Sequence, residues 1–255
     1  MKIVYGPVAS WRLGKSLGVD LICSPKKICS FDCIYCQLEK TEKLTSKRED
    51  FVSIRDVEKE IKHALQETKP DVITLSGTGE PTLAKNMPDT IKVIRKLTKI
   101  PIAILTNSTL LYDKDVQNTL KKIDIIVAKL DAPNEKIFKI VNRPAKDITF
   151  NKTLIGIKEM KDIFKGKFAL QIMFMNENKN YAKEIADLAR EINPDEVQIN
   201  TPLRPCEVSP LSKKEIKEIE KDFTGLNIIT VYSSTKPKTD PLDKIEIFKR
   251  RRLVK

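Results

Sequence analysis

Short runs of Val, Ile and Leu alternate along the chain with longer segments in which apolar residues recur every three or four positions. The short runs are typical of buried strands, and the longer segments are typical of amphipathic helices. We expect strands at residues 16–22, 71–75, 102–105, 123–130, 168–174, 196–200 and 227–232. We expect helices at residues 54–65, 88–97, 113–120, 135–141, 149–164, 181–192 and 212–222.

Strands that alternate with helices predict an α/β fold with a parallel sheet and right-handed crossovers. A barrel and an open doubly wound sheet both satisfy this order, and in either of them ligands bind at the carboxyl ends of the strands. No linker divides the chain. We therefore expect one domain over residues 1–235, followed by a short basic C-terminal extension over residues 236–255.

The 255 residues include 47 Lys and Arg against 35 Asp and Glu, so the formal net charge is +12. Clustered basic side chains release counterions when they neutralise phosphates, which favours a nucleic-acid partner. The alternative is excess lysine on solvated helix faces, because the charge is dispersed and aromatic residues make up only 6%. The densest basic cluster is the stretch 249–255, which a solvated tail also explains.

The chain has no run of about 18 apolar residues, which a membrane-spanning helix needs. Its first residues, MKIVYGPVASWRLGKS, lack the apolar core of a signal peptide. We therefore expect a cytoplasmic protein with no membrane segment. In that reducing compartment the five cysteines are not expected to form a disulfide framework.

Four of the cysteines, Cys23, Cys29, Cys33 and Cys36, lie within fourteen residues, which is typical of a metal site. The C-x3-C-x2-C spacing of the last three suits three irons of a cubane [4Fe–4S] cluster and leaves the fourth iron open. An open coordination position is what makes a metal site catalytic. The alternative is a structural zinc site completed by Cys23, although zinc sites usually contain two C-x2-C pairs.

This cysteine loop, with Tyr35 before its last cysteine, resembles that of the radical S-adenosylmethionine (SAM) superfamily. The resemblance implies a partial (β/α)6 barrel in which Cys29, Cys33 and Cys36 bind a [4Fe–4S] cluster and Tyr35 contacts the adenine of SAM. It implies that one electron cleaves SAM to methionine and a 5′-deoxyadenosyl radical, which takes a hydrogen atom from the substrate. A flavodoxin or ferredoxin is the implied electron donor.

The sequence SGTGEPTL over residues 76–83 matches the glycine–glutamate motif of the same superfamily. Gly77 and Gly79 let the backbone approach a ligand, and Glu80 can accept a hydrogen bond from an ammonium group. The family also implies that residues at the ends of the third and fourth strands meet the ribose and carboxylate of SAM. The candidates are Asn107, Lys129 and Asp131, each of which also suits a turn or helix cap. Two further polar residues on predicted strands are candidates to face inward, namely Gln171 and Asn200.

The segments 6–20, 140–144 and 200–205 are similar to those of a short branch of the superfamily related to the wyosine-base (tRNA 4-demethylwyosine) synthases. This resemblance implies a tRNA base as a candidate substrate. Those synthases carry further upstream cysteines for an auxiliary cluster, whereas only Cys23 precedes the motif here. The pyruvate-condensing reaction is therefore not expected. Three arginines in these segments suit a phosphate or carboxylate, or else pair with neighbouring acids: Arg12, Arg143 and Arg204.

Three functions remain open at this point. The first is a radical SAM enzyme with an unidentified substrate, for which a tRNA base is one candidate. The second is a radical SAM enzyme or activase that acts on a peptide or protein, and the third is a non-enzymatic nucleic-acid-binding protein with a structural metal. Cys206 is expected at the substrate mouth, where a thiol either donates a hydrogen atom or simply packs. The single histidine, His63, is expected to be exposed.

Overall fold

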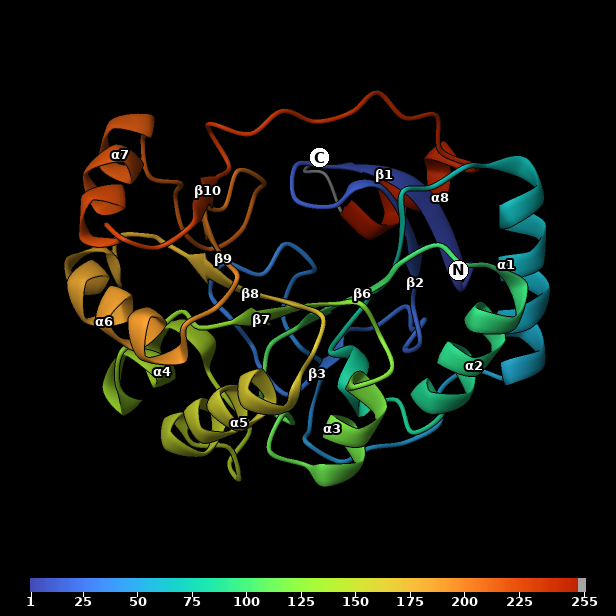
Figure 1. Ribbon diagram of the computed structural model, residues 1–255, viewed down its shortest axis with the longest axis horizontal. Coiled ribbons are helices and arrows are strands. Elements are labelled where there is room, and N and C mark those ends of the chain that lie inside the picture. The colour runs from blue at the N-terminus through green and yellow to red at the C-terminus, as the bar shows by residue number, and fades with distance from the viewer. Residues whose placement is uncertain (252–255) are drawn as a thin grey trace.

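The structure is a computed structural model that describes residues 1–251. A curled sheet forms its centre, and helices lie around the outside of that sheet (Figure 1). The strands of the central sheet are β1 (Val4–Ser10), β2 (Gly14–Val19), β5 (Val72–Leu75), β6 (Ile102–Thr106), β7 (Ile125–Lys129), β8 (Lys167–Met173), β9 (Glu196–Asn200) and β10 (Ile228–Thr230). Two short strands, β3 (Ile28–Cys29) and β4 (Lys43–Leu44), form a second sheet.

The helices are α1 (Ile54–Glu67), α2 (Met87–Leu97), α3 (Lys114–Leu120), α4 (Glu135–Asn142), α5 (Phe150–Ile163), α6 (Ala182–Ile192), α7 (Lys213–Asp222) and α8 (Lys244–Arg251). Short 3₁₀ turns lie at Pro81–Leu83 and Lys179–Tyr181. In the described part of the chain, none of the helices has both the length and the apolar character that a bilayer span requires.

The strand order along the central sheet is β1-β2-β5-β6-β7-β8-β9-β10. Every neighbouring pair from β2 to β10 is parallel, as expected for strands that are joined through helices. The α/β prediction with a partial barrel of parallel strands is thus confirmed. The helix starts also follow the sequence, since Ser53 accepts the Asp56 amide at 3.1 Å and Ser212 forms a capping box with Glu215.

One strand of the central sheet was not predicted, and neither were the two short strands of the second sheet. β1 pairs antiparallel with β2 and forms an edge of the sheet. Gly6 and Pro7 interrupt the alternation of apolar residues in this segment, and the register shifts between Tyr5 and Val8. Such irregularity is tolerated at an edge, where one side of the strand has no neighbour.

The parallel strands are apolar on both faces because helices cover one side and the barrel interior the other. A second apolar cluster lies beneath the cysteine loop, where the Phe31 ring meets the Phe138 ring of α4 edge-on at 5.2 Å between centroids. Burial of two aromatic side chains fixes this loop on α4. The cluster therefore determines where the cysteines lie.

The C-terminal segment, expected as a basic extension over 236–255, crosses the open side of the half-barrel from β10 to β1 (Figure 1). The Leu242 amide donates to the Gly6 carbonyl oxygen at 2.7 Å, and α8 packs against β1. Arg250, within the predicted basic cluster 249–255, is buried rather than solvated. Residues 252–255 of that cluster lie outside the described residues.

Candidate active site

The candidate site residues lie along one rim of the sheet, at the carboxyl ends of the parallel strands. The cysteine loop follows β2, the glycine–glutamate turn follows β5, Asn107 follows β6, and Lys129 ends β7. Neighbouring parallel strands end at the same rim, so residues far apart in the sequence meet there. The expected placement at strand ends is borne out by the topology.

The cysteine loop is held by the last turn of α4. The Asp32 amide donates to the Asn142 carbonyl oxygen at 3.0 Å, and the Ile34 amide donates to the Val141 carbonyl oxygen at 3.1 Å. The last carbonyl groups of a helix have no partner within the helix, so these amides satisfy them. The loop and the end of α4 thus stabilise each other.

Two asparagine side chains donate to the cysteine sulfurs. Asn107 Nδ2 lies 3.5 Å from Cys29 Sγ, and Asn142 Nδ2 lies 3.5 Å from Cys33 Sγ. Burial raises the pKa of Cys29 to about 12 and that of Cys33 to about 11. These thiols must lose their protons to bind iron, and hydrogen bonds to the sulfurs are among the features that set the potential of an iron–sulfur cluster.

Lys27, which the sequence analysis missed, places a buried ammonium group beside the three cysteines. Its Nζ lies 3.3 Å from the Glu39 carbonyl oxygen and 3.8 Å from Asp32 Oδ1. Burial opposes the charged form, yet the neighbouring cysteine side chains raise the pKa of Lys27 overall. The ammonium group therefore stays charged and compensates thiolate charge. In the sequence Lys27 is one lysine among many, so no signal distinguished it.

The cysteine arrangement fits a cubane cluster better than a single metal ion. Within residues 1–251, no group of three Cys, His, Asp or Glu side chains is placed to hold one ion. A cubane takes each cysteine on a different iron, so its ligands stand further apart than those of a zinc ion. Cys23 points elsewhere, with its Sγ 3.6 Å from the Met1 carbonyl oxygen. The alternative of a four-cysteine zinc site therefore does not fit.

Both glycines of the glycine–glutamate turn lie too close to neighbouring atoms to carry a Cβ atom. A Cβ atom on Gly79 would lie 1.7 Å from the Ile28 carbonyl oxygen, and one on Gly77 would lie 2.0 Å from Asp20 Cγ. Ile28 and Gly79 also form a parallel bridge. Only glycine lets the turn pack against the strand that leads to Cys29.

Glu80 is buried and organises the rim between β5 and β6. Its Oε1 accepts hydrogen bonds from the backbone and hydroxyl of Thr82 and from the Thr106 hydroxyl, while its Oε2 accepts the Asn107 amide at 2.6 Å. Burial raises the pKa of Glu80 in spite of these bonds. Because a carboxylate oxygen has two lone pairs, Oε2 can accept one further donor.

Asp131 fixes Tyr35 on the opposite side of the site. The Tyr35 hydroxyl donates to Asp131 Oδ2, which also accepts Asn142 Nδ2 at 3.0 Å. The Met173 amide donates to Asp131 Oδ1 at 2.8 Å. Lys129 Nζ lies 3.4 Å from Asp131 Oδ1 and 4.6 Å from the centroid of the Tyr35 ring. The aromatic residue before Cys36 is thus held rigidly, with its ring facing a cation.

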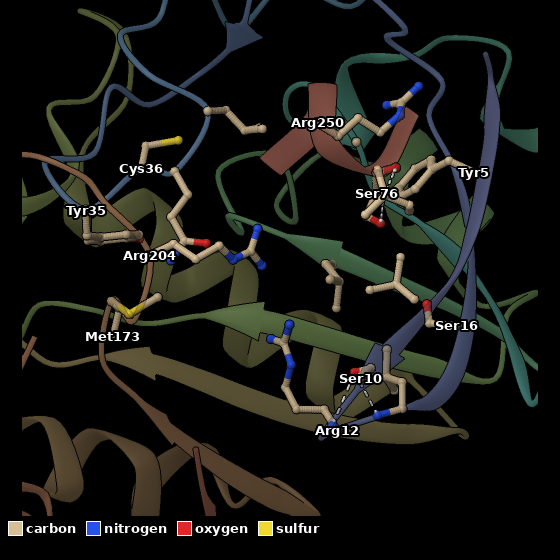
Figure 2. Close-up of a pocket in the computed structure, with 17 residues that line it drawn as sticks. Tyr5, Ser10, Arg12, Ser16, Tyr35, Cys36, Ser76, Met173, Arg204 and Arg250 are labelled. Atoms are coloured by element: carbon tan, nitrogen blue, oxygen red, sulfur yellow. Dashed lines mark hydrogen bonds between the residues drawn. The ribbon is translucent and has the colours of Figure 1, made fainter. Parts of the chain in front are cut away.

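Two adjacent cavities open at this rim. The first, of about 160 Å³, is lined by Cys29, Cys36, Gly79, Glu80, Asn107, Lys129 and Gln171, among other residues, so Gln171 does face inward. The second, of about 330 Å³, lies in the barrel lumen and is shown in Figure 2. The two share Cys36, Leu38 and Leu105 in their walls. The two cavities are therefore neighbours on either side of these three residues.

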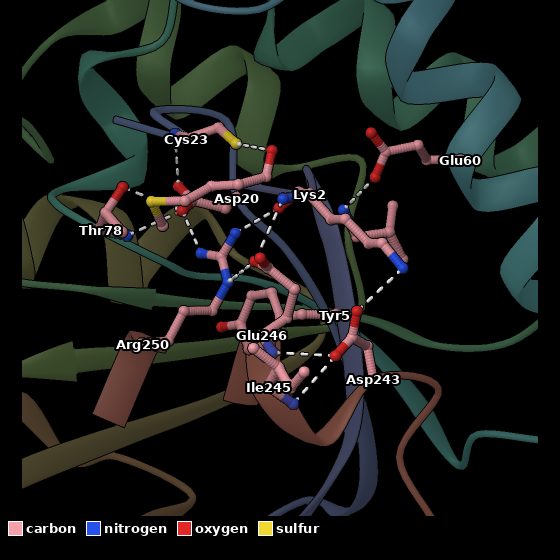
Figure 3. A network of polar contacts seen from close by, with 12 residues as sticks. Lys2, Tyr5, Asp20, Cys23, Glu60, Thr78, Asp243, Ile245, Glu246 and Arg250 are labelled. Carbon is pink, nitrogen blue, oxygen red and sulfur yellow. Dashed lines mark hydrogen bonds and ion pairs between the residues drawn. The ribbon is translucent and has the colours of Figure 1, made fainter. Parts of the chain in front are cut away.

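The buried carboxylate of Asp20, also missed by the sequence analysis, connects the cysteine loop, the glycine turn and the C-terminal helix (Figure 3). Its Oδ1 accepts the amides of Ile22 and Cys23 at 3.1 and 2.9 Å. Its Oδ2 accepts the amide and the hydroxyl of Thr78 at 3.1 and 2.9 Å, and it pairs with Arg250. The acceptor sites of one buried group thus hold three segments in place.

Other residues named from the sequence lie apart from the two cavities. Arg143 forms a bidentate ion pair with Glu207, in which Nη1 donates to Oε1 at 3.0 Å and Nη2 donates to Oε2 at 2.8 Å. Cys206 shares a surface pocket with Cys33 and Cys36, and its Sγ lies 3.1 Å from the Val208 carbonyl oxygen. Asn200 accepts the amide of the next residue in a turn, and His63 is exposed on α1 as expected.

We predict that Asp20→Asn lowers the free energy of unfolding of the metal-free protein by about 3 kcal/mol, because it removes the nearer of the two buried carboxylates that pair with Arg250 and leaves only Glu246, at 3.9 Å. The double variant Asp20→Asn/Arg250→Met should recover part of this loss. Asp89→Asn, which breaks an exposed pair with Lys92, should cost less than about 1 kcal/mol. Urea unfolding curves measure all three, and equal losses in the two single variants would contradict the prediction.

We predict that Lys27→Met lowers the reduction potential of the bound cluster, because a nearby positive charge favours the more negative, reduced state. The expected fall is of the order of 59 mV, equivalent to a tenfold change in the one-electron equilibrium. A redox titration followed by electron paramagnetic resonance measures it. Lys27→Arg should restore the potential, and Lys26→Met, at an exposed position, should leave it unchanged. A potential that is the same in all four proteins would refute the effect.

Comparison with curated proteins finds a UPF0026 protein of Methanocaldococcus jannaschii that is 37% identical over 235 residues, covering 90% of this chain and 72% of that protein. A protein named GTPase Obg from Brachyspira hyodysenteriae is 37% identical over 229 residues, but the chain spans only 33% of its length. A probable GTP 3′,8-cyclase of Saccharolobus islandicus is 24% identical over 222 residues, covering 85% of this chain and 68% of that protein.

Among solved structures, anSMEcpe with bound AdoMet has a TM-score of 0.65 at 18% identity and covers 85% of this chain and 64% of its own. TYW1 with a lysine–pyruvate adduct bound has a TM-score of 0.62 at 14% identity, covering 82% and 72%. At such identities these likenesses show the fold alone. The Radical SAM superfamily profile matches residues 24–189, which contain the cysteine loop and the glycine–glutamate turn. With its cysteine loop, its half-barrel and these relatives, the chain belongs to the radical SAM superfamily, among the UPF0026 proteins.

Proposed function

We propose that this chain cleaves SAM reductively and uses the resulting 5′-deoxyadenosyl radical to take a hydrogen atom from a substrate in the barrel lumen. The observation that carries the proposal is the gathering of Cys29, Cys33 and Cys36 against the glycine–glutamate turn, beside two adjacent cavities. Family membership gives the [4Fe–4S] cluster and SAM as the cofactors. Membership of this superfamily also argues against a non-enzymatic binding protein with a structural metal.

The smaller cavity suits SAM, and this chain's residues would orient it there. The free lone pair on Glu80 Oε2 suits the ammonium group, and the Gly79 backbone leaves room for it. Lys129 supplies N–H donors for the carboxylate, and Asn107 lines the same cavity. Tyr35, held by Asp131, lines the larger cavity, so the contact to adenine that the family resemblance implies would be made from that side of the shared wall.

The larger cavity suits the substrate. Because it shares Cys36, Leu38 and Leu105 with the smaller one, a radical formed on the SAM side would lie close to a substrate in the lumen. The C-terminal helix α8 contributes Ile247 and Arg250 to the wall of the larger cavity.

For the substrate we propose a tRNA base, within a branch related to the wyosine-base synthases. The net charge of +12 and the relative named GTP 3′,8-cyclase favour a nucleotide substrate. A base must leave its stack to enter a cavity of this size, as other base-modifying enzymes require. We also propose a cytoplasmic location and a flavodoxin or ferredoxin as the electron donor.

The radical chemistry predicts 5′-deoxyadenosine after anaerobic reconstitution with iron and sulfide, reduction and addition of SAM. Cys29→Ala or Cys33→Ala should abolish both the cluster and the product, since each removes an iron ligand. Cys206→Ala should retain both, although it lies beside Cys33 and Cys36. Iron analysis and chromatography measure the two quantities. An iron-loaded protein that leaves SAM intact would refute the proposal, and iron loss in Cys206→Ala would make that cysteine a ligand.

The tRNA proposal predicts that unmodified tRNA binds the reconstituted enzyme, and that its affinity falls steeply as salt rises because phosphate contacts release counterions. Reaction with SAM should change the mass of one nucleoside, as measured by mass spectrometry of the digested tRNA. A matched peptide mixture should not change. Binding that is absent or insensitive to salt, together with a modified peptide, would favour the peptide-modifying alternative instead.

A further inference from the structure

The larger cavity has a cationic wall. Arg12 reaches it from the turn between β1 and β2, Arg204 from the loop after β9, and Arg250 from α8. Figure 2 shows Arg12 and Arg204 pointing into the cavity. Among the lining residues in the described part of the chain there is no Asp or Glu. The volume of about 330 Å³ lies within the range of small-molecule sites.

Arg12 has two buried donors, Nε and Nη1, with no hydrogen-bond partner among the described residues. Arg250 in the same wall has one such donor, its Nε, which lies 3.9 Å from Glu246 Oε2. The Trp11 ring lies 5.4 Å from Arg12 Cζ, but a ring face does not replace acceptors for the in-plane N–H groups. Burial and the nearby Arg204 lower the pKa of Arg12 to about 10. Buried donors beside a second cation are costly unless an anion joins them.

Among the described residues, the carboxylates that could neutralise Arg12 are engaged elsewhere. Glu196 acts on Arg12 from a distance, but its oxygens already contact Lys167 Nζ and Gln198 Nε2, each at 2.8 Å. Asp20 is paired with Arg250. Arg143 shows the contrasting case, because both arms of its guanidinium are taken by Glu207 outside the lumen.

We propose that Arg12 and Arg204 bind an oxyanion of the substrate, a phosphate or a carboxylate, within the barrel lumen. Guanidinium groups recognise such anions through paired N–H donors. Ser10 lines the same wall, and its Oγ accepts the amides of Arg12 and Leu13 at 3.2 and 3.1 Å, so its hydroxyl proton remains available to the anion. This turn therefore fixes Arg12 and adds a donor beside it.

Anion binding at this site does not depend on the proposed function. Only the reaction that follows binding rests on it. The oxyanion site is distinct from the SAM cavity, whose lining residues include neither Arg12 nor Arg204. A substrate held by its anionic end at these arginines can present its other end at the wall shared with the SAM cavity. A nucleotide would supply a phosphate, and a small organic acid would supply a carboxylate.

The test measures binding of labelled orthophosphate and labelled acetate to the reconstituted enzyme by equilibrium dialysis at constant ionic strength. We expect saturable binding that weakens about tenfold or more in Arg12→Gln and in Arg204→Gln, the effect of losing charged hydrogen bonds. Arg143→Gln is the matched control and should bind as the parent does. Stronger binding of phosphate supports a nucleotide substrate, and stronger binding of acetate supports a carboxylic acid.

Two further readouts locate the anion and guard against misfolding. Trp11 is the sole tryptophan, so its fluorescence should respond to the anion in the parent protein. Cluster content and thermal unfolding check that each variant is folded. Arg12→Lys keeps the positive charge but lacks the paired N–H donors of a guanidinium group, so it should bind the anion with intermediate affinity. Saturating SAM should leave anion binding unchanged.

The proposal is overturned if neither anion binds, if Arg12→Gln and Arg204→Gln bind as the parent does, or if SAM competes with the anion. Formation of 5′-deoxyadenosine in the absence of substrate tests the proposed function separately. A protein that makes 5′-deoxyadenosine but binds neither anion refutes the oxyanion site alone. A protein that binds the anion but never cleaves SAM leaves the site standing and refutes the radical function.

Discussion

The buried carboxylate of Asp20 is the interaction on which the rest of the site depends. A carboxylate removed from water must be paired and hydrogen-bonded, and Asp20 meets that requirement with groups from the cysteine loop, the glycine turn and α8. The start of the loop therefore cannot move without disturbing the turn. The chain also closes on itself here, because Arg250 lies 230 positions from Asp20 in the sequence.

The same rule shapes the remaining rim. Glu80 and Asp131 are buried, and each is surrounded by donors that hold neighbouring strand ends in register. Such networks are rigid because these carboxylates and their donors satisfy one another. Arg12 departs from this pattern, since its Nε and Nη1 atoms have no acceptor among the described residues. The buried carboxylates thus organise the site, whereas the charged side chains that line the larger cavity are cationic.

Much of the fold and of the cluster site follows from local sequence. The strand and helix periods predict alternating units, because side-chain burial on a sheet or helix repeats with a fixed spacing. The cysteine spacing and the Gly77–Glu80 turn are also local, so their chemistry could be stated before the structure. Even the role of glycine follows, since close backbone approach needs a residue without a Cβ atom.

What only the tertiary structure decided are the contacts between distant segments. The irregular segment β1 forms a strand because it can pair with the edge of β2. Lys27 lies beside the cysteines because the next residue, Ile28, begins β3, which pairs with β4. Arg12, Arg143 and Arg204 look alike in the sequence, yet Glu207 pairs with Arg143 while the other two converge in the lumen. The physical reason is that sequence spacing fixes local geometry, whereas charge pairing and burial depend on which strand ends the sheet brings together.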